Sequence, residues 1–202
     1  MEDIEQTTPE EESKKIKAQK TILSYLHDLV FGLVAVLLVF MLVFRVIVVS
    51  GPSMKETLQD GDCILLLSSV FYKEPKYGDI VVVSKKAYKD GEAIIKRVIA
   101  TEGQEVNIDF VSGIVSVDGI PLDESYVNTP TNEFEGVEFP QTVPADCVFV
   151  LGDNRNSSKD SRSPDIGMID KREILGKALV IALPGQDEAT GKRNFKRIGV
   201  LW

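Results

Sequence analysis

The longest apolar stretch of the chain lies near its N-terminus, where residues 29–49 contain one charged side chain, Arg45. As a helix, these residues would be about 31 Å long, which matches the hydrocarbon thickness of a bilayer. Buried helices of soluble domains are seldom apolar on every face, as this stretch is. We therefore predict a membrane-anchor helix over residues 21–49, with Arg45 near enough to its end to reach the lipid headgroups.

The residues before the anchor differ sharply from it. Residues 1–20 are polar and almost free of apolar side chains, so we expect a mobile tail. Four lysines precede the apolar stretch: Lys14, Lys15, Lys17 and Lys20. Residues 50–69 contain only Lys55, and because positive charge favours the cytoplasmic side, the tail is expected in the cytoplasm and the remainder outside. The run exceeds the ~7–15 apolar residues of a cleaved signal peptide and no A-x-A site follows it, so we expect an uncleaved anchor.

From residue 50 onward the apolar residues form short β-branched runs. Seven such runs are CILLLSS, DIVVVSK, AIIKRVIA, EVNIDF, GIVSVDG, CVFVLGD and ALVIALP. Turn signals such as QDGD, KYGD and KDGE separate them. This spacing, without intervening helical patterns, is typical of an all-β sandwich or barrel. We predict a mainly β domain over residues 50–202, in which residues 126–144 form a loop or hairpin insertion and DKREILGKA forms one or two helical turns.

Charge and cysteine content narrow the function classes. The formal net charge is −8 and no basic block occurs after residue 50, so nucleic acid is not expected as a partner. The two cysteines, Cys63 and Cys147, lie far apart, each within an apolar run. With one histidine in the chain, a structural zinc site is not expected. We expect the two thiols to be buried and inert, although the sequence also allows a disulfide between them.

The position of the single histidine limits the catalytic chemistry. His27 lies on the cytoplasmic flank of the predicted anchor, whereas the predicted β domain lies on the other side. A Ser-His-Asp or Cys-His arrangement therefore cannot form within that domain. A hydrolase built there would need Lys, Asp, Glu or Tyr as its base. A metal hydrolase fits poorly without histidines, although carboxylates alone could hold Mg²⁺ or Ca²⁺.

Three segments carry candidate chemistry. The turn SGPSMKETL, directly after the apolar stretch, places Ser53 on a tight loop. In the predicted strand AIIKRVIA, alternation would point either Lys96 or Arg97 inward, and burial would lower the pKa of an inward lysine. The loop GDNRNSSKDSR concentrates hydroxyls, carboxylates and arginines over residues 152–162. Taken singly, these features are more typical of an ordinary turn serine, a surface lysine and a solvated turn, and the loop does not match an EF-hand.

Taken together and in this order, the segments resemble the type I signal peptidases, the bacterial leader peptidase family. The matching boxes are S-M-K-E-T-L at 53–58, K-R-V-I at 96–99 and G-D-N-R-N-S-S-K-D-S-R at 152–162. Shorter matches are L-x-x-G-D at 58–62 and G-D-I-V-V at 78–82. The resemblance covers the chain from about residue 20 onward, and the third box is highly specific. It implies a signal-peptidase-like β-barrel or sandwich preceded by one transmembrane helix.

The resemblance also implies residue roles. Ser53 matches the nucleophile, Lys96 the general base and Ser158 the hydroxyl that orients the lysine. Four residues match scaffold contacts behind the site: Asp160, Arg162, Asp153 and Arg97. Gly152 matches a position where the backbone approaches closely. The implied activity is a serine endopeptidase, without cofactor or metal, that cuts secretory precursors bearing small side chains one and three residues before the cut.

Two positions depart from the family pattern. Glu56 stands where the family usually has proline, so the turn after the nucleophile loses a restraint on φ. Gly51 stands where some members have a serine that helps to hold the oxyanion, so the oxyanion would rest mainly on the Ser53 N–H. The short gap over residues 100–151 resembles the compact single-span form common in Gram-positive bacteria. Self-cleaving repressors share a Ser-Lys pair but have no anchor, and a non-catalytic anchored β domain that binds envelope proteins remains the alternative.

Overall fold

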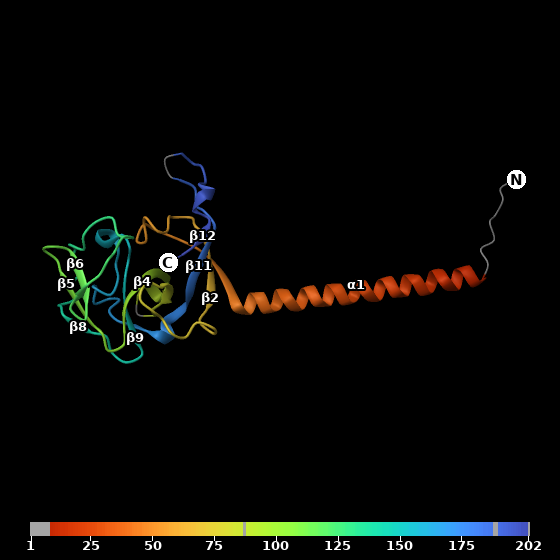
Figure 1. Ribbon diagram of the computed structural model, residues 1–202, viewed down its shortest axis with the longest axis horizontal. Helices are drawn as coiled ribbons and strands as arrows, with labels where there is room; N and C mark the ends of the chain where they lie inside the picture. Colours follow the sequence, from red (N-terminus) through yellow and green to blue (C-terminus); the bar gives the residue numbers. More distant parts are fainter. Residues whose placement is uncertain (1–8, 87, 188–189, 202) are drawn as a thin grey trace. The chain divides into compact units, whose positions relative to one another are not determined.

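The described part of the N-terminal unit is one long helix with a long apolar segment. The computed structural model describes residues 9–86, 88–187 and 190–201, and the chain divides into two units at residues 42 and 43 (Figure 1). Helix α1 (Pro9–Val43) contains the segment Gln19–Val43, which has a mean hydropathy of 2.6 and is long enough to cross a membrane. The predicted apolar helix is therefore confirmed, but both of its ends differ from the prediction.

The helix begins before the predicted start. Residues 9–20, expected in a mobile tail, form the first turns of α1, while residues 1–8 lie outside the described residues. We predicted a tail because this segment is polar, but its residues also favour a helix. Pro9 occupies the first helical position, three glutamates fill the first turn, and lysines follow four residues later.

The helix also ends earlier than predicted. Residues 44–48 form strand β1 (Phe44–Val48), which pairs antiparallel with β2 (Cys63–Ser68) from Phe44↔Leu67 to Val48↔Cys63. Arg45 therefore lies exposed on a strand and not in a membrane helix. The run FRVIV is apolar and β-branched, so it fits either structure locally, and pairing with β2 decides for the strand.

Two sheets make up the C-terminal unit. The larger adds to β1 and β2 the strands β3 (Ile80–Ser84), β4 (Ala93–Thr101), β9 (Cys147–Leu151), β10 (Ile169–Asp170), β11 (Ile174–Leu183) and β12 (Gly199–Val200). Its order is β1-β2-β11-β3-β4-β9-β10, with β12 on β11. The smaller sheet, in the order β7-β6-β5-β8, contains β5 (Glu105–Asp109), β6 (Ile114–Val117), β7 (Ile120–Pro121) and β8 (Gln141–Thr142). Figure 1 shows the smaller sheet at the opposite end of the domain from β2, β11 and β12.

The mainly β prediction is confirmed, and all seven predicted runs form strands. Short 3₁₀ turns lie between them: η1 (Lys89–Gly91), η2 (Arg155–Ser157), η3 (Lys171–Glu173) and η4 (Phe195–Arg197). The helical turns expected in DKREILGKA shrink to η3, because Asp170 and Glu173 close a capping box around one turn. The remainder, from Ile174, belongs to β11, where a Cβ on Gly176 would overlap the Leu67 carbonyl oxygen of the neighbouring strand.

Strand β4 lies within the large sheet, with apolar clusters on both of its faces. Ile95 belongs to the cluster that includes Met54 and Leu58, whereas Val98 belongs to a second cluster that includes Ile169. The prediction that only Lys96 or Arg97 would point inward is therefore wrong. Both are buried, at 2% and 1% exposure, because a sheet covered on both faces has no solvent side.

Candidate active site

Ser53 lies in the loop between β1 and β2, on a short helical turn. The Lys55 N–H donates to the Pro52 carbonyl at 3.0 Å, and the Leu58 N–H donates to that of Met54 at 2.8 Å. Met54 and Leu58, four residues apart, share one face of this turn and are buried in the core. These two apolar residues fix the turn and leave Ser53, beside the exposed Pro52, half-buried at the surface of the domain.

The structure brings Lys96 and Ser53 together from different elements. The Lys96 Nζ donates to the Ser53 Oγ at 2.9 Å and to the Ile95 carbonyl at 2.9 Å. Burial lowers the pKa of Lys96 to about 8, because a charged amine loses hydration inside the domain. The carboxylates of Asp160, Glu135 and Asp153 partly oppose this shift in the Lys96 pKa, and Arg162 adds to it. Such an amine can be neutral near physiological pH, as a general base must be.

A cleft of about 350 Å³ leads to this pair. One wall comes from residues 47–49 at the end of β1, and the other from residues 93–95 of β4, with Ser53 and Lys96 among the lining residues. The walls are mostly apolar, while Tyr88, Glu92 and Lys159 supply polar groups. The cleft therefore suits an extended peptide that brings one of its carbonyl groups to Ser53.

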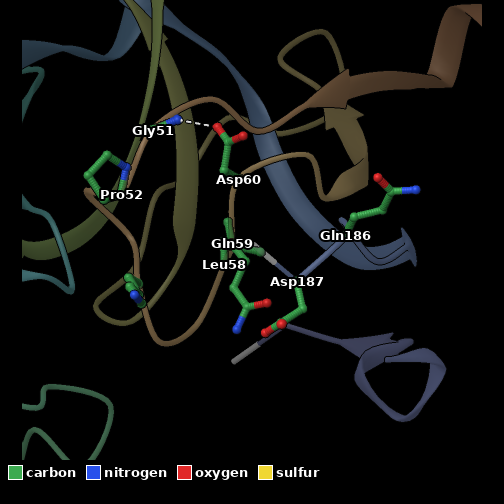
Figure 2. A pocket seen from close by; sticks show the side chains of 8 residues that line it. Gly51, Pro52, Leu58, Gln59, Asp60, Gln186 and Asp187 are labelled. Carbon is green, nitrogen blue, oxygen red and sulfur yellow. Dashed lines mark hydrogen bonds between the residues drawn. The ribbon is translucent and has the colours of Figure 1, made fainter. Parts of the chain in front are cut away.

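A second cleft, of about 400 Å³, lies beside the same loop (Figure 2). Gly51 and Pro52 line both clefts, whereas Asp60, Gln186 and Asp187 line only the second. The Gly51 N–H donates to the Asp60 Oδ1 at 2.8 Å, and Gly51 has a φ of +86°, a conformation that favours glycine. Neither Ser53 nor Lys96 lines this cleft, so the first cleft is the candidate active site.

Glu56 is the other departure from the family pattern. It lies at the surface of the turn over residues 52–58 that carries Ser53, here called the nucleophile turn. Its side chain is exposed, and the Lys55–Glu56 peptide bond is cis. The hydroxyl of Thr57, the next residue, donates to the Asp153 Oδ2 at 2.5 Å. The turn is therefore attached to the third box by Thr57 and not by Glu56.

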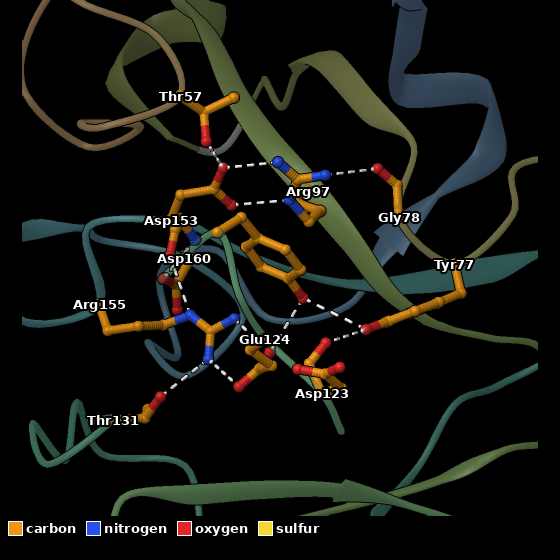
Figure 3. A network of polar contacts seen from close by, with 12 residues as sticks. Thr57, Tyr77, Gly78, Arg97, Asp123, Glu124, Thr131, Asp153, Arg155 and Asp160 are labelled. Atoms are coloured by element: carbon orange, nitrogen blue, oxygen red, sulfur yellow. Dashed lines mark hydrogen bonds and ion pairs between the residues drawn. The ribbon is translucent and has the colours of Figure 1, made fainter. Parts of the chain in front are cut away.

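Arg97, which follows Lys96 on β4, forms a buried ion pair with Asp153 (Figure 3). Ser53 and Lys96 are called the candidate dyad below. The Arg97 guanidinium donates from Nε and Nη2 to the two carboxylate oxygens at 2.8 and 2.7 Å. This two-pronged geometry is the strong form of the arginine–carboxylate contact. Because Asp153 also accepts from Thr57, the pair connects β4 with the nucleophile turn.

Asp160 and Arg162 brace the third box in the same way. Arg162 donates from Nε to the Asp160 Oδ1 at 2.8 Å and from Nη2 to its Oδ2 at 2.9 Å. The Gly152 N–H donates to the same carboxylate at 3.0 Å, and Arg162 also donates to the carbonyl oxygens of Arg155 and Ser158. The loop is thus closed on itself around one buried ion pair.

Ser158 is buried near Ser53 but does not make the contact that was expected. It is 7% exposed, and its Oγ has no hydrogen-bond partner among the described residues. The predicted hydrogen bond to Lys96 is therefore not formed. A Cβ on Gly152 would overlap Ser158 and would lie 2.6 Å from the Ser53 carbonyl oxygen. Gly152 thus lets the third box approach both serines.

The third box also holds the main chain of the nucleophile turn. The Asn154 N–H donates to the Ser53 carbonyl at 3.0 Å, and the Asn154 Nδ2 donates to the Pro52 carbonyl at 3.1 Å. Asn154 was not singled out from the sequence, although it lies inside the box. It fixes the backbone on both sides of the bond between Pro52 and Ser53.

A further anchor of the nucleophile loop comes from the C-terminus of the chain. Arg197 donates to both oxygens of the fully buried Asp62, at 2.8 and 2.7 Å, and to the Thr57 carbonyl at 3.3 Å. Asp62 also accepts from the N–H groups of Gln59 and Gly185. Burial raises the pKa of the Asp62 carboxyl, but these bonds, first that from Arg197, bring it below its usual value. The L-x-x-G-D match pointed to Asp62, whereas no sequence signal identified Arg197.

The 126–144 insertion docks onto the third box through Tyr126. The Arg97 guanidinium lies 4.0 Å from the centroid of the Tyr126 ring, and the Arg155 guanidinium lies 6.0 Å from it. Arg155 donates to Glu124, two residues before Tyr126, and to Thr131. The sequence predicted a loop here but gave no partner for it.

Cysteine and metal chemistry find no support in the described part of the chain. Cys63 and Cys147 are both unpaired and half-buried, and burial raises the pKa of the Cys147 thiol. Within residues 9–86, 88–187 and 190–201, no group of three or more His, Cys, Asp or Glu side chains could hold a metal ion.

A serine hydroxyl against a buried amine, at the end of an apolar cleft in a mainly β domain, is an arrangement suited to a serine peptidase with a lysine base. Comparison with known proteins supports this class. The family model for "Signal peptidase, peptidase S26" matches residues 22–185. The chain therefore belongs to the signal peptidase family and is a membrane-anchored peptidase.

Several signal peptidases are similar to the chain. The probable signal peptidase I-1 of Synechocystis sp. is 37% identical over 164 residues, which cover 77% of this chain and 80% of that protein. The signal peptidase I of Bacillus licheniformis is 30% identical over 185 residues, covering 86% and 95%. A crystal structure of a signal peptidase I from Enterococcus faecalis aligns with a TM-score of 0.42 at 28% identity, covering 52% of this chain and 97% of that one. The predicted family is confirmed, and the non-catalytic alternative loses its support.

Proposed function

We propose that the chain removes N-terminal signal peptides from secretory precursors, with Ser53 as nucleophile and Lys96 as general base. The observation that carries this proposal is the 2.9 Å contact between the Ser53 Oγ and the Lys96 Nζ. Lys96 as a residue is 2% exposed. Membership of the signal peptidase family supplies the substrate class.

The reaction is acyl transfer in two steps. Neutral Lys96 takes the proton of the Ser53 hydroxyl as the oxygen attacks the carbonyl before the cut, and it returns that proton to the leaving amine. The signal peptide is then held as an ester on Ser53. A water molecule that gives its proton to Lys96 attacks the ester. Lys96 passes this proton to the departing Ser53 oxygen, and the signal peptide leaves with its new carboxyl end. Because burial lowers the pKa of Lys96 to about 8, the base is present without any histidine.

The backbone of Ser53 supplies a donor for the oxyanion of the tetrahedral intermediate. Its N–H donates to no other described residue, whereas the Gly51 N–H is already bonded to Asp60. A preorganised N–H at this point stabilises the developing negative charge. This assignment agrees with the absence of a serine hydroxyl at position 51.

The cleft supports a preference for small side chains. In an extended peptide, the residues one and three before the cut point to the same side, because successive side chains alternate. Both would face the apolar walls formed by residues 47–49 and 93–95. Met54 also lines this space. Large side chains at those two positions would meet these walls and hold the scissile carbonyl away from Ser53, so short side chains are preferred.

The anchor supports action at a membrane surface. We propose that the segment Gln19–Val43 is the anchor, that the residues before it lie in the cytoplasm, and that the catalytic domain, which begins with β1, is extracytoplasmic. Ser53 follows the helix by ten residues (53 − 43), which span at most about 35 Å. Enzyme and signal sequence would share one bilayer, which raises their effective concentration.

The test uses the full-length protein in detergent micelles and a precursor with an A-x-A site. We expect Ser53→Ala and Lys96→Ala each to lose at least ~10³-fold in turnover, because each removes half of a unit that acts together. The matched controls are Ser157→Ala, an exposed serine of the third box, and Lys192→Ala, an exposed lysine. Circular dichroism verifies that each variant folds. Cleavage by folded Ser53→Ala at the wild-type rate would refute the proposal, and retained cleavage by Lys96→Ala alone would point to another base.

A further inference from the structure

The peptide group between Pro52 and Ser53 carries the N–H that is proposed to hold the oxyanion. A peptide group is planar, so the Pro52 carbonyl oxygen and the Ser53 N–H belong to one rigid unit and point in opposite directions. Two donors fix this carbonyl oxygen: the Lys55 N–H at 3.0 Å and the Asn154 Nδ2 at 3.1 Å. The bond from Lys55 lies within the nucleophile turn and moves with it, whereas the bond from Asn154 ties the peptide group to the third box.

The same residue holds the peptide group on the other side of Ser53. The Asn154 N–H donates to the Ser53 carbonyl oxygen at 3.0 Å. The third box can come this close because Gly152 has no Cβ, which would lie 2.6 Å from that oxygen. The peptide groups before and after Ser53 are thus both bonded to Asn154, and rotation of either group would break a hydrogen bond.

Asn154 lies between two residues that are firmly held. Asp153 and Arg155 are both fully buried, and each makes an ion pair, Asp153 with Arg97 and Arg155 with Glu124. Their packing leaves the backbone of Asn154 little freedom. Such a residue can hold the peptide group in place before a substrate arrives, which preorganised stabilisation of charge requires.

Gly51 makes the oxyanion depend on this one peptide group. Position 51 has no side chain that could donate, and the Gly51 N–H already donates to the Asp60 Oδ1 at 2.8 Å. A hydrogen bond to a carbonyl oxygen also polarises its peptide group, which strengthens the N–H of that group as a donor. The Asn154 side chain therefore acts on both the direction and the strength of the Ser53 N–H.

We propose that Asn154 is a positioning residue for the oxyanion: its side-chain amide holds the Pro52–Ser53 peptide group so that the Ser53 N–H points at the oxygen of the scissile carbonyl. The inference rests on the proposed function, in which the Ser53 Oγ attacks that carbonyl. Asn154 acts through the Pro52 carbonyl and not on the substrate itself. The third box thereby contributes to the stabilisation of the transition state as well as to the packing of the site.

The first test compares kcat and KM of Asn154→Ala with those of wild type. The variant loses the bond from Nδ2 but keeps the bond from the N–H to the Ser53 carbonyl, so Ser53 stays close to the third box. Because the oxyanion forms after the substrate has bound, we expect kcat to fall about 20-fold and KM to change by less than about twofold. Circular dichroism verifies that the variant folds. An unchanged kcat would overturn the proposal.

A second measurement separates positioning from a general loss of structure. A peptide that ends after an A-x-A site as an aldehyde adds to the Ser53 hydroxyl and forms a tetrahedral hemiacetal, whose oxygen takes the place of the oxyanion. The same peptide ending as a carboxamide binds without this bond. We expect Asn154→Ala to weaken the aldehyde about 20-fold and the carboxamide by less than about twofold. Equal weakening of both ligands would mean that the side chain only supports the fold.

Two variants make these tests specific. Asn156→Ala is the matched control, because the Asn156 Nδ2 also donates to a carbonyl at 3.1 Å, but to that of Pro130 in the insertion. We expect this variant to keep the wild-type kcat and the wild-type ratio of the two affinities. Asn154→Asp keeps the shape of the side chain but places an acceptor against the Pro52 carbonyl, so it should lose at least as much as Asn154→Ala. An Asp variant with wild-type kcat would contradict the role of the Nδ2 donor.

The two ligands also separate this inference from the proposed function. A wild-type protein that cleaves no precursor and binds the aldehyde no more tightly than the carboxamide would refute both. A wild-type protein that cleaves precursors and prefers the aldehyde, together with an Asn154→Ala variant that keeps the full preference, would refute the role of Asn154 alone.

Discussion

The two members of the candidate dyad lie in regions of opposite character. Lys96 is on β4, which is hydrogen-bonded to β3 and β9 and covered by side chains on both faces. Ser53 is on a half-buried loop with one helical turn, and segments far away in the sequence hold this loop. Those segments are the third box, which contacts Pro52 and Ser53 through Asn154, and the C-terminal η4, which contributes Arg197.

This difference separates two tasks within one site. The sheet buries the Lys96 amine away from water and thereby lowers its pKa. This requires dense packing on every side of the amine. In the proposed mechanism, the loop presents the Ser53 hydroxyl to an incoming peptide. This requires an open side, so polar contacts hold the loop in place of a core. We expect substitutions on the sheet side to change the protonation and stability of the base, and substitutions around the loop to change the placement of the nucleophile.

Among residues outside the candidate dyad, the largest effect on activity is expected where the two regions touch, at Gly152. In Gly152→Ala, the new Cβ would overlap Ser158 and lie 2.6 Å from the Ser53 carbonyl oxygen, so the third box and the nucleophile loop must separate. We expect kcat/KM to fall by about 10²-fold or more, because a displacement near 1 Å is enough for such a loss. Precursor cleavage by the folded variant measures this.

The control for this prediction is another glycine of the same domain. At Gly199 an added Cβ would meet no atom within 4 Å, so Gly199→Ala should retain nearly wild-type activity. Equal activity of Gly152→Ala and Gly199→Ala would show that the close approach of the two regions is not needed for catalysis.

Removing the buried amine is expected to change stability as well as activity. Burial lowers the pKa of Lys96 from 10.5 to about 8, so the amine disfavours folding at every pH below about 8, and this cost disappears as the pH rises towards 10.5. Lys96→Met should therefore raise the free energy of unfolding by about 1–3 kcal/mol at pH 7 while it abolishes turnover. Urea unfolding at pH 7 and pH 10 measures the gain, which should shrink at the higher pH.

The exposed Lys192 provides the comparison for the stability measurement, and Lys192→Met should change stability by less than about 0.5 kcal/mol at either pH. A loss of stability in Lys96→Met at pH 7 would mean that the amine is not held inside the domain against a hydration cost.

The smallest effect is expected on the loop side, at Arg197. Arg197→Ala leaves Asp62 with only its backbone donors and frees the Thr57 carbonyl, so the nucleophile turn is less well fixed. We expect kcat/KM to fall about tenfold and stability to fall by about 1 kcal/mol, with partial recovery in Arg197→Lys. Cleavage and urea unfolding measure the two effects.

Lys196 is the neighbouring control, because its side chain is exposed and, within the part of the chain that the structure describes, its hydrogen bond is one from the backbone N–H to Asn194. If Lys196→Ala loses as much activity as Arg197→Ala, the C-terminal segment acts through its general packing and not through the bond to Asp62.

Much of the fold could be predicted because its signals are local. Seven β-branched runs between turn signals predicted seven strands, and one apolar run predicted the helix. The errors occurred where one pattern allows two structures. Residues 44–48 are apolar enough for a membrane helix and β-branched enough for a strand, and only their pairing with β2 decides between them. Residues 9–20 are polar, as a tail would be, yet they are also good helix formers.

The sequence by itself predicted the apolar helix, the class of fold and the two members of the candidate dyad, because an apolar run, β-branched runs and short boxes are contiguous in the chain. Only the tertiary structure decided what surrounds those groups. Asp62 and Arg197 are separated by 135 residues, and Pro52 and Asn154 by 102, yet both pairs hold the loop that carries Ser53. Such contacts depend on how distant segments pack, for which a local pattern carries no signal.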